Sequence, residues 1–161
     1  MSSKTDIDVA AARRRVATVA VRTPLVASLP LSDRLGVEVF LKLESIQPTG
    51  TFKVRGAASK ILALTEKERA RGVVTASTGN HGRAVAYVAR RLGIPATVCV
   101  SSGVPAGKLS ALQDLNADRE VVGDSQSRAL DRAQEIARDR GLTFVHPFDD
   151  PDVIAGQATI G

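Results

Sequence analysis

Four short runs of β-branched or aromatic residues recur at a constant spacing, and this spacing is the strongest constraint on the fold. Their markers, Thr75, Val98, Val121 and Phe144, are each 23 residues apart. An interval of that length holds one strand, one helix and two short loops, which is the repeat of successive βαβ units. The sequence therefore predicts an α/β fold with an open parallel sheet flanked by helices.

Hydrophobic periodicity assigns further elements. Alternation of apolar and polar residues predicts a strand over 37–43, and apolar positions at i, i+3, i+4, i+7 and i+8 predict a helix over 54–62. The residues before Arg22 are expected to form a surface helix leading into the domain. Asp150 as N-cap, followed by Pro151, predicts a helix that continues to the last residue. The other expected elements are strands at 73–76, 96–100, 121–122 and 143–145, and helices at 85–92, 105–115 and 125–141.

The composition narrows the classes of partner. The formal net charge of +5 would suit an acidic partner, but aromatic residues make up only 3% and offer no platform on which bases could stack. No apolar run approaches the roughly 20 residues of a membrane-spanning helix. Asp6 and Asp8 argue against a targeting segment. The single cysteine, Cys99, lies in an apolar run and is expected in the core of a cytoplasmic protein. Neither nucleic acid nor a membrane is expected as a partner.

Two loops carry unusual residues at positions where parallel sheets bind ligands, since they precede helix starts at strand ends. The first is Gln47–Lys53. Lys53 stands at the start of a helix, where the macrodipole disfavours an ammonium, so the pKa of Lys53 is expected to be lowered. A lysine that readily becomes neutral suits Schiff-base chemistry. A lone lysine, by contrast, is more often a solvated surface residue.

The second loop is the turn Ser77–Gly82 between a strand and a helix. Its free N–H groups and the hydroxyls of Ser77 and Thr78 can converge on a carboxylate. Taken alone, the loop could equally be an N-capped helix start with incidental polar residues. With only two histidines in the chain, a zinc site is not expected. His81 is expected to shape the loop, and His146 to be structural.

The segment Thr51–Gly56 resembles the Ser-Phe-Lys-x-Arg-Gly signature of the tryptophan-synthase-β-like (fold type II) pyridoxal 5'-phosphate (PLP) enzymes, in their serine/threonine dehydratase branch. The resemblance runs from about Arg22 to the last residue. It implies that PLP is the cofactor, that Lys53 is its Schiff-base lysine and that Phe52 lies behind the pyridine ring. Ser77–His81 resembles the family's Ser-x-Gly-Asn-His loop. By this resemblance Asn80 bonds the phenolic oxygen of PLP, and the substrate carboxylate is bound by Ser77, Thr78, Gly79, Asn80 and His81.

The resemblance implies an ammonia lyase that removes water and ammonia from a small β-hydroxy-amino acid to give a 2-oxo acid. The segments Thr75–Ala86 and His146–Asp152 resemble the hydroxyectoine-utilisation dehydratases. Classical threonine dehydratases usually read Ala-Gln where this chain has Gly82 and Arg83, so the identity of the hydroxy-amino acid stays open.

The same resemblance divides the chain into residues 1–52, part of a large PLP domain; residues 53–148, a small α/β domain; and residues 149–161, a return into the large domain. Nothing in the sequence matches the family's glycine-rich phosphate cradle. We therefore expect an amino-terminal fragment that is inactive by itself, and whose full-length form binds a small amino acid as a homo-oligomer.

Two alternatives remain. An amino-acid racemase on the same scaffold would place an acid/base hydroxyl where Thr78 stands, so that activity is an open possibility beside the lyase. A non-catalytic signalling module such as a receiver domain needs clustered acids at strand ends for magnesium. The first expected strand instead ends in Lys42-Leu43-Glu44-Ser45, which disfavours that class.

Overall fold

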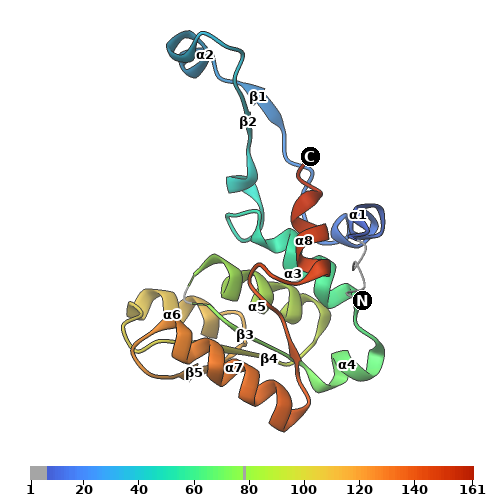
Figure 1. The fold of residues 1–161 in the computed structure, drawn as a ribbon, viewed down its shortest axis with the longest axis vertical. Coiled ribbons are helices and arrows are strands. Elements are labelled where there is room, and N and C mark those ends of the chain that lie inside the picture. Colours follow the sequence, from blue (N-terminus) through green and yellow to red (C-terminus); the bar gives the residue numbers. More distant parts are fainter. Residues whose placement is uncertain (1–6, 78) are drawn as a thin grey trace, which may run out of the picture.

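The computed structural model describes residues 7–77 and 79–161 and confirms the α/β class (Figure 1). Its main sheet has four strands in the order β5-β4-β3-β6, and every pair of neighbours is parallel. Each of the equally spaced sequence markers lies in one of these strands, so the spacing predicted the sheet correctly. The strands are β3 (Val73–Ala76), β4 (Ala96–Val100), β5 (Asp118–Val121) and β6 (Thr143–Phe144).

Helices cover both faces of this sheet. They are α5 (Asn80–Leu92) and α6 (Ala106–Gln113) on one face and α7 (Gln126–Arg140) on the other. Alternate residues of β4 point to opposite faces, as the pleat of a strand requires. Val98 and Val100 therefore join the cluster with α5, whereas Cys99 joins the cluster with α7. Burial raises the pKa of the Cys99 thiol to about 11, so Cys99 is a protonated core residue as predicted.

The strand order creates a topological switch point between β3 and β6. From β3 the chain moves outward to β4 and β5, with α5 and α6 on one face. α7 then crosses the other face and delivers β6 to the free side of β3. The loops that follow β3 and β6 consequently diverge at the carboxyl edge of the sheet. Open parallel sheets bind their ligands in crevices of this kind.

A further helical layer packs on α5. It consists of α3 (Lys53–Ala63), which contacts α5, together with α1 (Val9–Val16) and α8 (Pro151–Ala158), which both contact α3. The first helix is not purely a surface helix, because Ala12 and Val16 on its inner side are buried. The predicted cap of α8 is confirmed, since Asp150 Oδ1 accepts from the N–H groups of Asp152 and Val153. The helix ends at Ala158, however, rather than continuing to the last residue.

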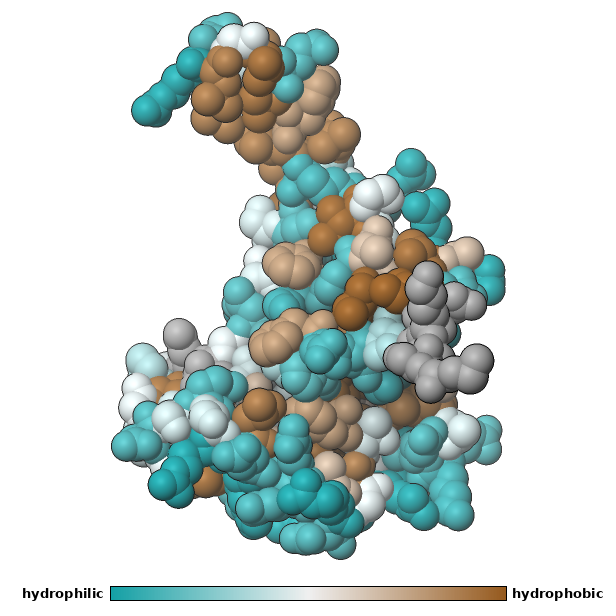
Figure 2. Space-filling view, viewed as in Figure 1, coloured by the Kyte–Doolittle hydropathy of each residue, from teal (hydrophilic) through white to brown (hydrophobic). Residues whose placement is uncertain are grey.

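The predicted strand over 37–43 needs correction. Only β2 (Phe40–Lys42) is a strand, and it pairs antiparallel with the unpredicted β1 (Leu25–Ala27) rather than joining the main sheet. Together with α2 (Leu29–Leu35), these strands form an arm that projects from the body (Figure 1). The alternating pattern suggested a strand with one face in a core, yet much apolar surface of the arm is exposed, as the brown patch at the top of Figure 2 shows.

Two short elements complete the description. The 3-10 helix η1 (Glu44–Ile46) links the arm to the loop before Lys53, and α4 (Glu66–Arg71) links α3 to β3. Neither was predicted. Across the part of the chain that the structure describes, no helix combines the length and apolar character that spanning a bilayer requires.

The crossing of α3 and α8 depends on two facing glycines, Gly56 and Gly156. A Cβ added at Gly156 would lie 2.6 Å from the carbonyl oxygen of Arg55 and 2.7 Å from the Cα of Gly56. Because both contacts are with backbone atoms, the helices would have to separate. We expect Gly156→Ala to lower the free energy of unfolding by about 1–3 kcal/mol, as measured by urea denaturation.

Gly107 of α6 provides the matched control, because a Cβ there would meet nothing within 4 Å. We expect Gly107→Ala to be neutral or stabilising. Equal stability of the Gly156→Ala and Gly107→Ala variants would show that the crossing of α3 and α8 adjusts without cost.

Candidate functional site

Three segments that are far apart in sequence meet at the switch point: the start of α3, the loop after β3 and the loop after β6. The link between the first and third is direct, since Lys53 Nζ donates a hydrogen bond of 2.9 Å to the carbonyl oxygen of Pro147. The sequence predicted the first two segments but missed the third. A signal was available, because equal strand spacing places the loops after Thr75 and Phe144 at the same edge of the sheet.

Lys53 is the first residue of α3 and is half-buried. Burial lowers the pKa of its amine, which is the predicted direction, although the cause is desolvation rather than the helix start. The Nζ atom lies 5.4 Å from the centroid of the Phe52 ring. Phe52 is itself 38% exposed, so an aromatic surface lies open beside the amine. This arrangement provides an amine that loses its proton more readily than a surface lysine.

The loop after β3 leads directly into α5. Ser77 Oγ accepts a 3.2 Å hydrogen bond from the N–H of Gly79, and Asn80 is exposed at the first position of the helix. A Cβ added at Gly79 would meet nothing within 4 Å, so this side of the loop is open. The predicted residue Thr78 lies outside the described residues.

The described helices fall into two groups by how they begin. The helices that start at the site, α3 and α5, have no side-chain cap among the described residues, and neither do α2 and α6. By contrast, α1, α4, α7 and α8 are capped by the side chains of Asp8, Thr65, Ser125 and Asp150. Uncapped N-terminal N–H groups are available to anions. At the start of α3, the N–H groups of Lys53 and Gly56 are already bound by Thr51 Oγ1 and Gln157 Oε1. The backbone donors that the site can offer to a carboxylate or a phosphate are therefore mainly those at the start of α5.

His81 is buried, and its side chain points into the interior of the fold. Its Nε2 lies 3.1 Å from the carbonyl oxygen of Val145; a carbonyl only accepts, so Nε2 carries the proton. Burial lowers the pKa of His81 to about 4 despite that hydrogen bond, and the positive charge of Lys53 lowers it further. Among the described residues, Nδ1 has no partner. His81 is thus neutral at neutral pH, and it faces β6 rather than solvent, so contact with a substrate would have to involve its backbone N–H.

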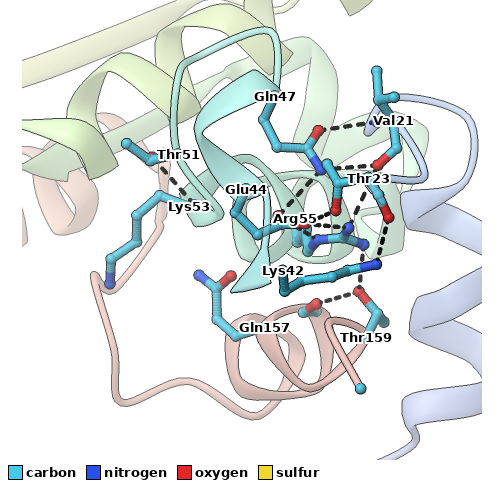
Figure 3. Close-up of polar contacts among 12 residues, drawn as sticks. Val21, Thr23, Lys42, Glu44, Gln47, Thr51, Lys53, Arg55, Gln157 and Thr159 are labelled. Carbon is cyan, nitrogen blue, oxygen red and sulfur yellow. Dashed lines mark hydrogen bonds and ion pairs between the residues drawn. The ribbon is translucent and has the colours of Figure 1, made fainter. Parts of the chain in front are cut away.

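On the other side of α3, a buried network surrounds Arg55 (Figure 3). The guanidinium forms a bidentate pair with Glu44, with Nε–Oε2 at 2.8 Å and Nη2–Oε1 at 2.7 Å. Gln47 in turn accepts from the N–H of Val21 and donates to its carbonyl oxygen, at 2.9 and 2.8 Å. Lys53 lies apart from this cluster (Figure 3). The network fixes both ends of the loop that presents Lys53, because it holds η1 and the first turn of α3.

Sequence reasoning missed this network. The available signal was an arginine beside the apolar face of α3, a position that requires a buried acidic partner. The 11-residue separation of Glu44 and Arg55 gave no periodic pattern by which the pair could be recognised.

The profile of the family described as "Pyridoxal-phosphate dependent enzyme" matches residues 16–161. The L-threonine ammonia-lyase of Thermotoga maritima is 46% identical over 154 residues, which are 96% of this chain and 38% of that protein. The catabolic L-threonine dehydratase of Escherichia coli is 40% identical over 154 residues, which are 96% of this chain and 47% of that protein.

Solved structures give the same pattern. Processed threonine deaminase isoform 2 from Solanum lycopersicum has a TM-score of 0.89 at 37% identity, covering 94% of this chain and 42% of that chain. Maize serine racemase has a TM-score of 0.90 at 33% identity, covering 96% of this chain and 47% of that chain. The chain thus spans less than half the length of each of these relatives.

Proposed function

Because the chain belongs to the pyridoxal-phosphate-dependent enzyme family, we propose that it acts in an ammonia-lyase (dehydratase) reaction on a small β-hydroxy-amino acid, with Lys53 as the cofactor-linked lysine. The observation that carries this proposal is the Lys53 amine. It is half-buried, its pKa is lowered, and it lies at the switch point, where it donates a hydrogen bond to the loop after β6. Relatives named as L-threonine ammonia-lyase and L-threonine dehydratase support the choice of reaction.

The residues present fit PLP. The cofactor needs an amine that can become neutral, a flat surface for its ring and donors for its oxygen atoms. Lys53 supplies the amine, the exposed ring of Phe52 supplies a surface, and the uncapped start of α5 supplies donors beside Asn80. When bound, PLP supplies an electron sink for the charge that remains after a proton leaves the substrate Cα.

Each residue of the site has a separate role in the proposed reaction. The neutral amine of Lys53 accepts the Cα proton, and its lowered pKa increases the fraction of neutral amine at a given pH. The hydroxyl of Ser77 and the backbone N–H groups from Gly79 onward bind the substrate carboxylate. Asn80 would donate a hydrogen bond to the phenolic oxygen of the cofactor. His81 stays neutral, so it places no competing positive charge beside Lys53.

A second activity has a specific observation in its favour. The TM-score with maize serine racemase is 0.90, nearly the same as the TM-score of 0.89 with the threonine deaminase from Solanum lycopersicum. An amino-acid racemase is therefore the alternative on this scaffold. Within the lyase proposal, we favour a hydroxyectoine-derived hydroxy-amino acid over threonine itself, because Gly82 and Arg83 stand where classical threonine dehydratases usually read Ala-Gln.

One experiment tests both activities. The protein, in the full-length form that the sequence leads us to expect, is supplied with PLP and given L-threonine, L-serine or a hydroxyectoine-derived hydroxy-amino acid, and ammonia, 2-oxo acid and optical rotation are followed together. We expect equal amounts of ammonia and 2-oxo acid. Loss of optical rotation without ammonia would instead identify a racemase, and the absence of both would contradict the proposal. Lys67→Ala, which removes an exposed lysine from α4, is the control for the loss of a lysine charge in variants of Lys53.

The role of Ser77 leads to a separate prediction. A hydrogen bond to a charged carboxylate is worth about 1.5–3 kcal/mol, so Ser77→Ala should raise the KM for the amino acid on the order of 10- to 100-fold. Cofactor occupancy should change much less, because Ser77 is assigned to the substrate. Steady-state kinetics and PLP titration measure the two effects. Ser127→Ala, at an exposed position of α7, is the matched control. Parallel loss of cofactor would show that the loop holds PLP instead.

A further inference from the structure

The loop after β6 is shaped by a single imidazole. The Nδ1 atom of His146 accepts hydrogen bonds from the N–H groups of Phe148 at 3.2 Å and Asp149 at 2.7 Å. Both partners are donors, so Nδ1 must present its lone pair and the neutral ring carries its proton on Nε2. The ring stands edge-on to Phe144 and to Phe148, with centroid distances of 5.7 and 4.7 Å. His146 thus closes a tight turn with its own side chain and is held there by two aromatic neighbours.

Both ends of this turn are fixed independently of His146. On its N-terminal side, the carbonyl oxygen of Val145 accepts from Thr75 Oγ1 at 2.7 Å and from His81 Nε2 at 3.1 Å. On its C-terminal side, Asp150 caps α8 and its carboxylate pairs with Lys60 at 2.8 Å. The segment between these anchors is residues 146–149. Within it, the side-chain contacts to the backbone among the described residues are the two hydrogen bonds to His146 and the hydrogen bond from Lys53.

Pro147 lies inside the turn that the imidazole closes. Its carbonyl oxygen is the acceptor for Lys53 Nζ, at 2.9 Å. The pyrrolidine ring fixes φ at this residue. The direction of the carbonyl then depends on the peptide that follows, which belongs to Phe148, and the N–H of that peptide is bound by His146. The imidazole therefore determines where the Pro147 carbonyl points.

We propose that His146 is a positioning residue for Lys53. The neutral imidazole of His146 holds the Pro147 carbonyl in place as the hydrogen-bond acceptor for the Lys53 amine while that amine is not bonded to the cofactor. The proposal rests on the proposed role of Lys53 and adds to it the residue that orients the amine before the cofactor arrives. A lysine side chain has many rotamers, and ordering them beforehand removes part of the entropic cost of reaction. With the acceptor misplaced, the Lys53 amine would sample more conformations and react more slowly with PLP.

Two substitutions of nearly equal size separate the hydrogen bonds from the bulk of the ring. In His146→Asn, the amide oxygen can take the place of Nδ1, since asparagine accepts from backbone N–H groups two and three residues further on. In His146→Leu, the side chain has a similar shape but accepts nothing. Both variants lose the imidazole, so any difference between them reports the acceptor.

Two readouts are measured on the cofactor-free protein. The first is hydrogen exchange at the N–H groups of Phe148 and Asp149. The second is the rate at which added PLP is captured at Lys53, trapped by borohydride and mapped to its peptide by mass spectrometry. In His146→Leu we expect about five- to ten-fold faster exchange at both N–H groups, as for the loss of one ordinary hydrogen bond, with capture slowed by a similar factor. In His146→Asn we expect both rates to stay within about three-fold of the original protein.

The outcomes are distinguishable. Capture at Lys53 that is equally fast in both variants and the original protein would overturn the positioning role while leaving the role of Lys53 intact. Equal slowing in both variants would show that the ring itself, and not its acceptor atom, matters, and would also overturn the proposal. Absence of capture at Lys53 in the unaltered protein would contradict the proposed function itself. If His146→Leu does not fold, His146→Gln replaces it, because its amide oxygen lies one methylene too far to close the turn and capture should again be slow.

Discussion

Replacing Lys53 with alanine should abolish the covalent attachment of PLP and lower kcat on the order of 10²- to 10⁴-fold or more, because the same amine both attaches the cofactor and moves the Cα proton. The absorbance of PLP bound to the protein should be lost together with activity. Lys53→Arg should behave in the same way, because a guanidinium keeps the positive charge but does not become neutral. Absorbance titration with PLP and steady-state kinetics measure the two losses.

Lys60 provides an internal comparison on the same helix. Burial alone would lower the pKa of Lys60, but the carboxylates of Asp150 and Asp152 outweigh it and raise the pKa. The pKa of Lys53 is lowered by burial. Lys53 should therefore lose its proton, and gain reactivity toward an amine reagent, at a lower pH than Lys60 does. Borohydride labelling should mark Lys53 and spare Lys60, whereas equal labelling of both would contradict the assignment.

The fold was predictable to the extent that it depends on local periodicity. Each of the strands β3 to β6 contains one of the equally spaced markers, although β5 (Asp118–Val121) begins three residues before the predicted strand at 121–122 and is mostly charged. The order β5-β4-β3-β6 was not predictable in this way, because equal spacing is compatible with β6 on either edge of the sheet. The helix α4 had a readable signal, the reciprocal capping box of Thr65 and Glu68, which was overlooked. The arm was unpredictable because its apolar residues do not mark a buried face.

The candidate site follows the same division. Lys53, Ser77 and Asn80 could be predicted as site residues because each lies in a short motif beside a helix start, and the comparisons support the family that those motifs suggested. The acceptor for Lys53 is a backbone carbonyl, that of Pro147, and backbone groups leave no trace in side-chain patterns. The dependence of the Lys53 loop on Glu44 and Arg55 arises from contacts between segments, and no local spacing encodes it.

Removing one partner of the Glu44–Arg55 pair should have one of the largest effects on stability of any single substitution. The two side chains are only 12% and 7% exposed, and they meet through a bidentate contact. Removing one partner of a buried pair leaves the other charge without compensation, at a cost of about 3–5 kcal/mol. We expect Glu44→Gln to lower the free energy of unfolding at neutral pH by roughly that amount. Glu38→Gln is the control, since Glu38 is exposed on the arm and forms no ion pair within the described ranges.

The pH dependence of this effect identifies its cause. Burial alone would raise the pKa of the Glu44 carboxyl, but hydrogen bonds from Arg55 and Thr23 and the Arg55 charge outweigh it and lower the pKa below its ordinary value of 4.5. Stability from a carboxyl with a lowered pKa is fully present above the unfolded value and is lost as the pH falls through the folded value. The difference in unfolding free energy between the original protein and Glu44→Gln should thus be constant above about pH 5 and shrink as the solution becomes more acidic. Urea denaturation at a series of pH values measures this difference. A difference that stayed constant into strong acid would mean that Glu44 acts through its shape and not through its charge.

Slower capture of PLP at Lys53 in Glu44→Gln, at a pH where the variant remains folded, would further show that the ion pair holds the loop that presents the amine.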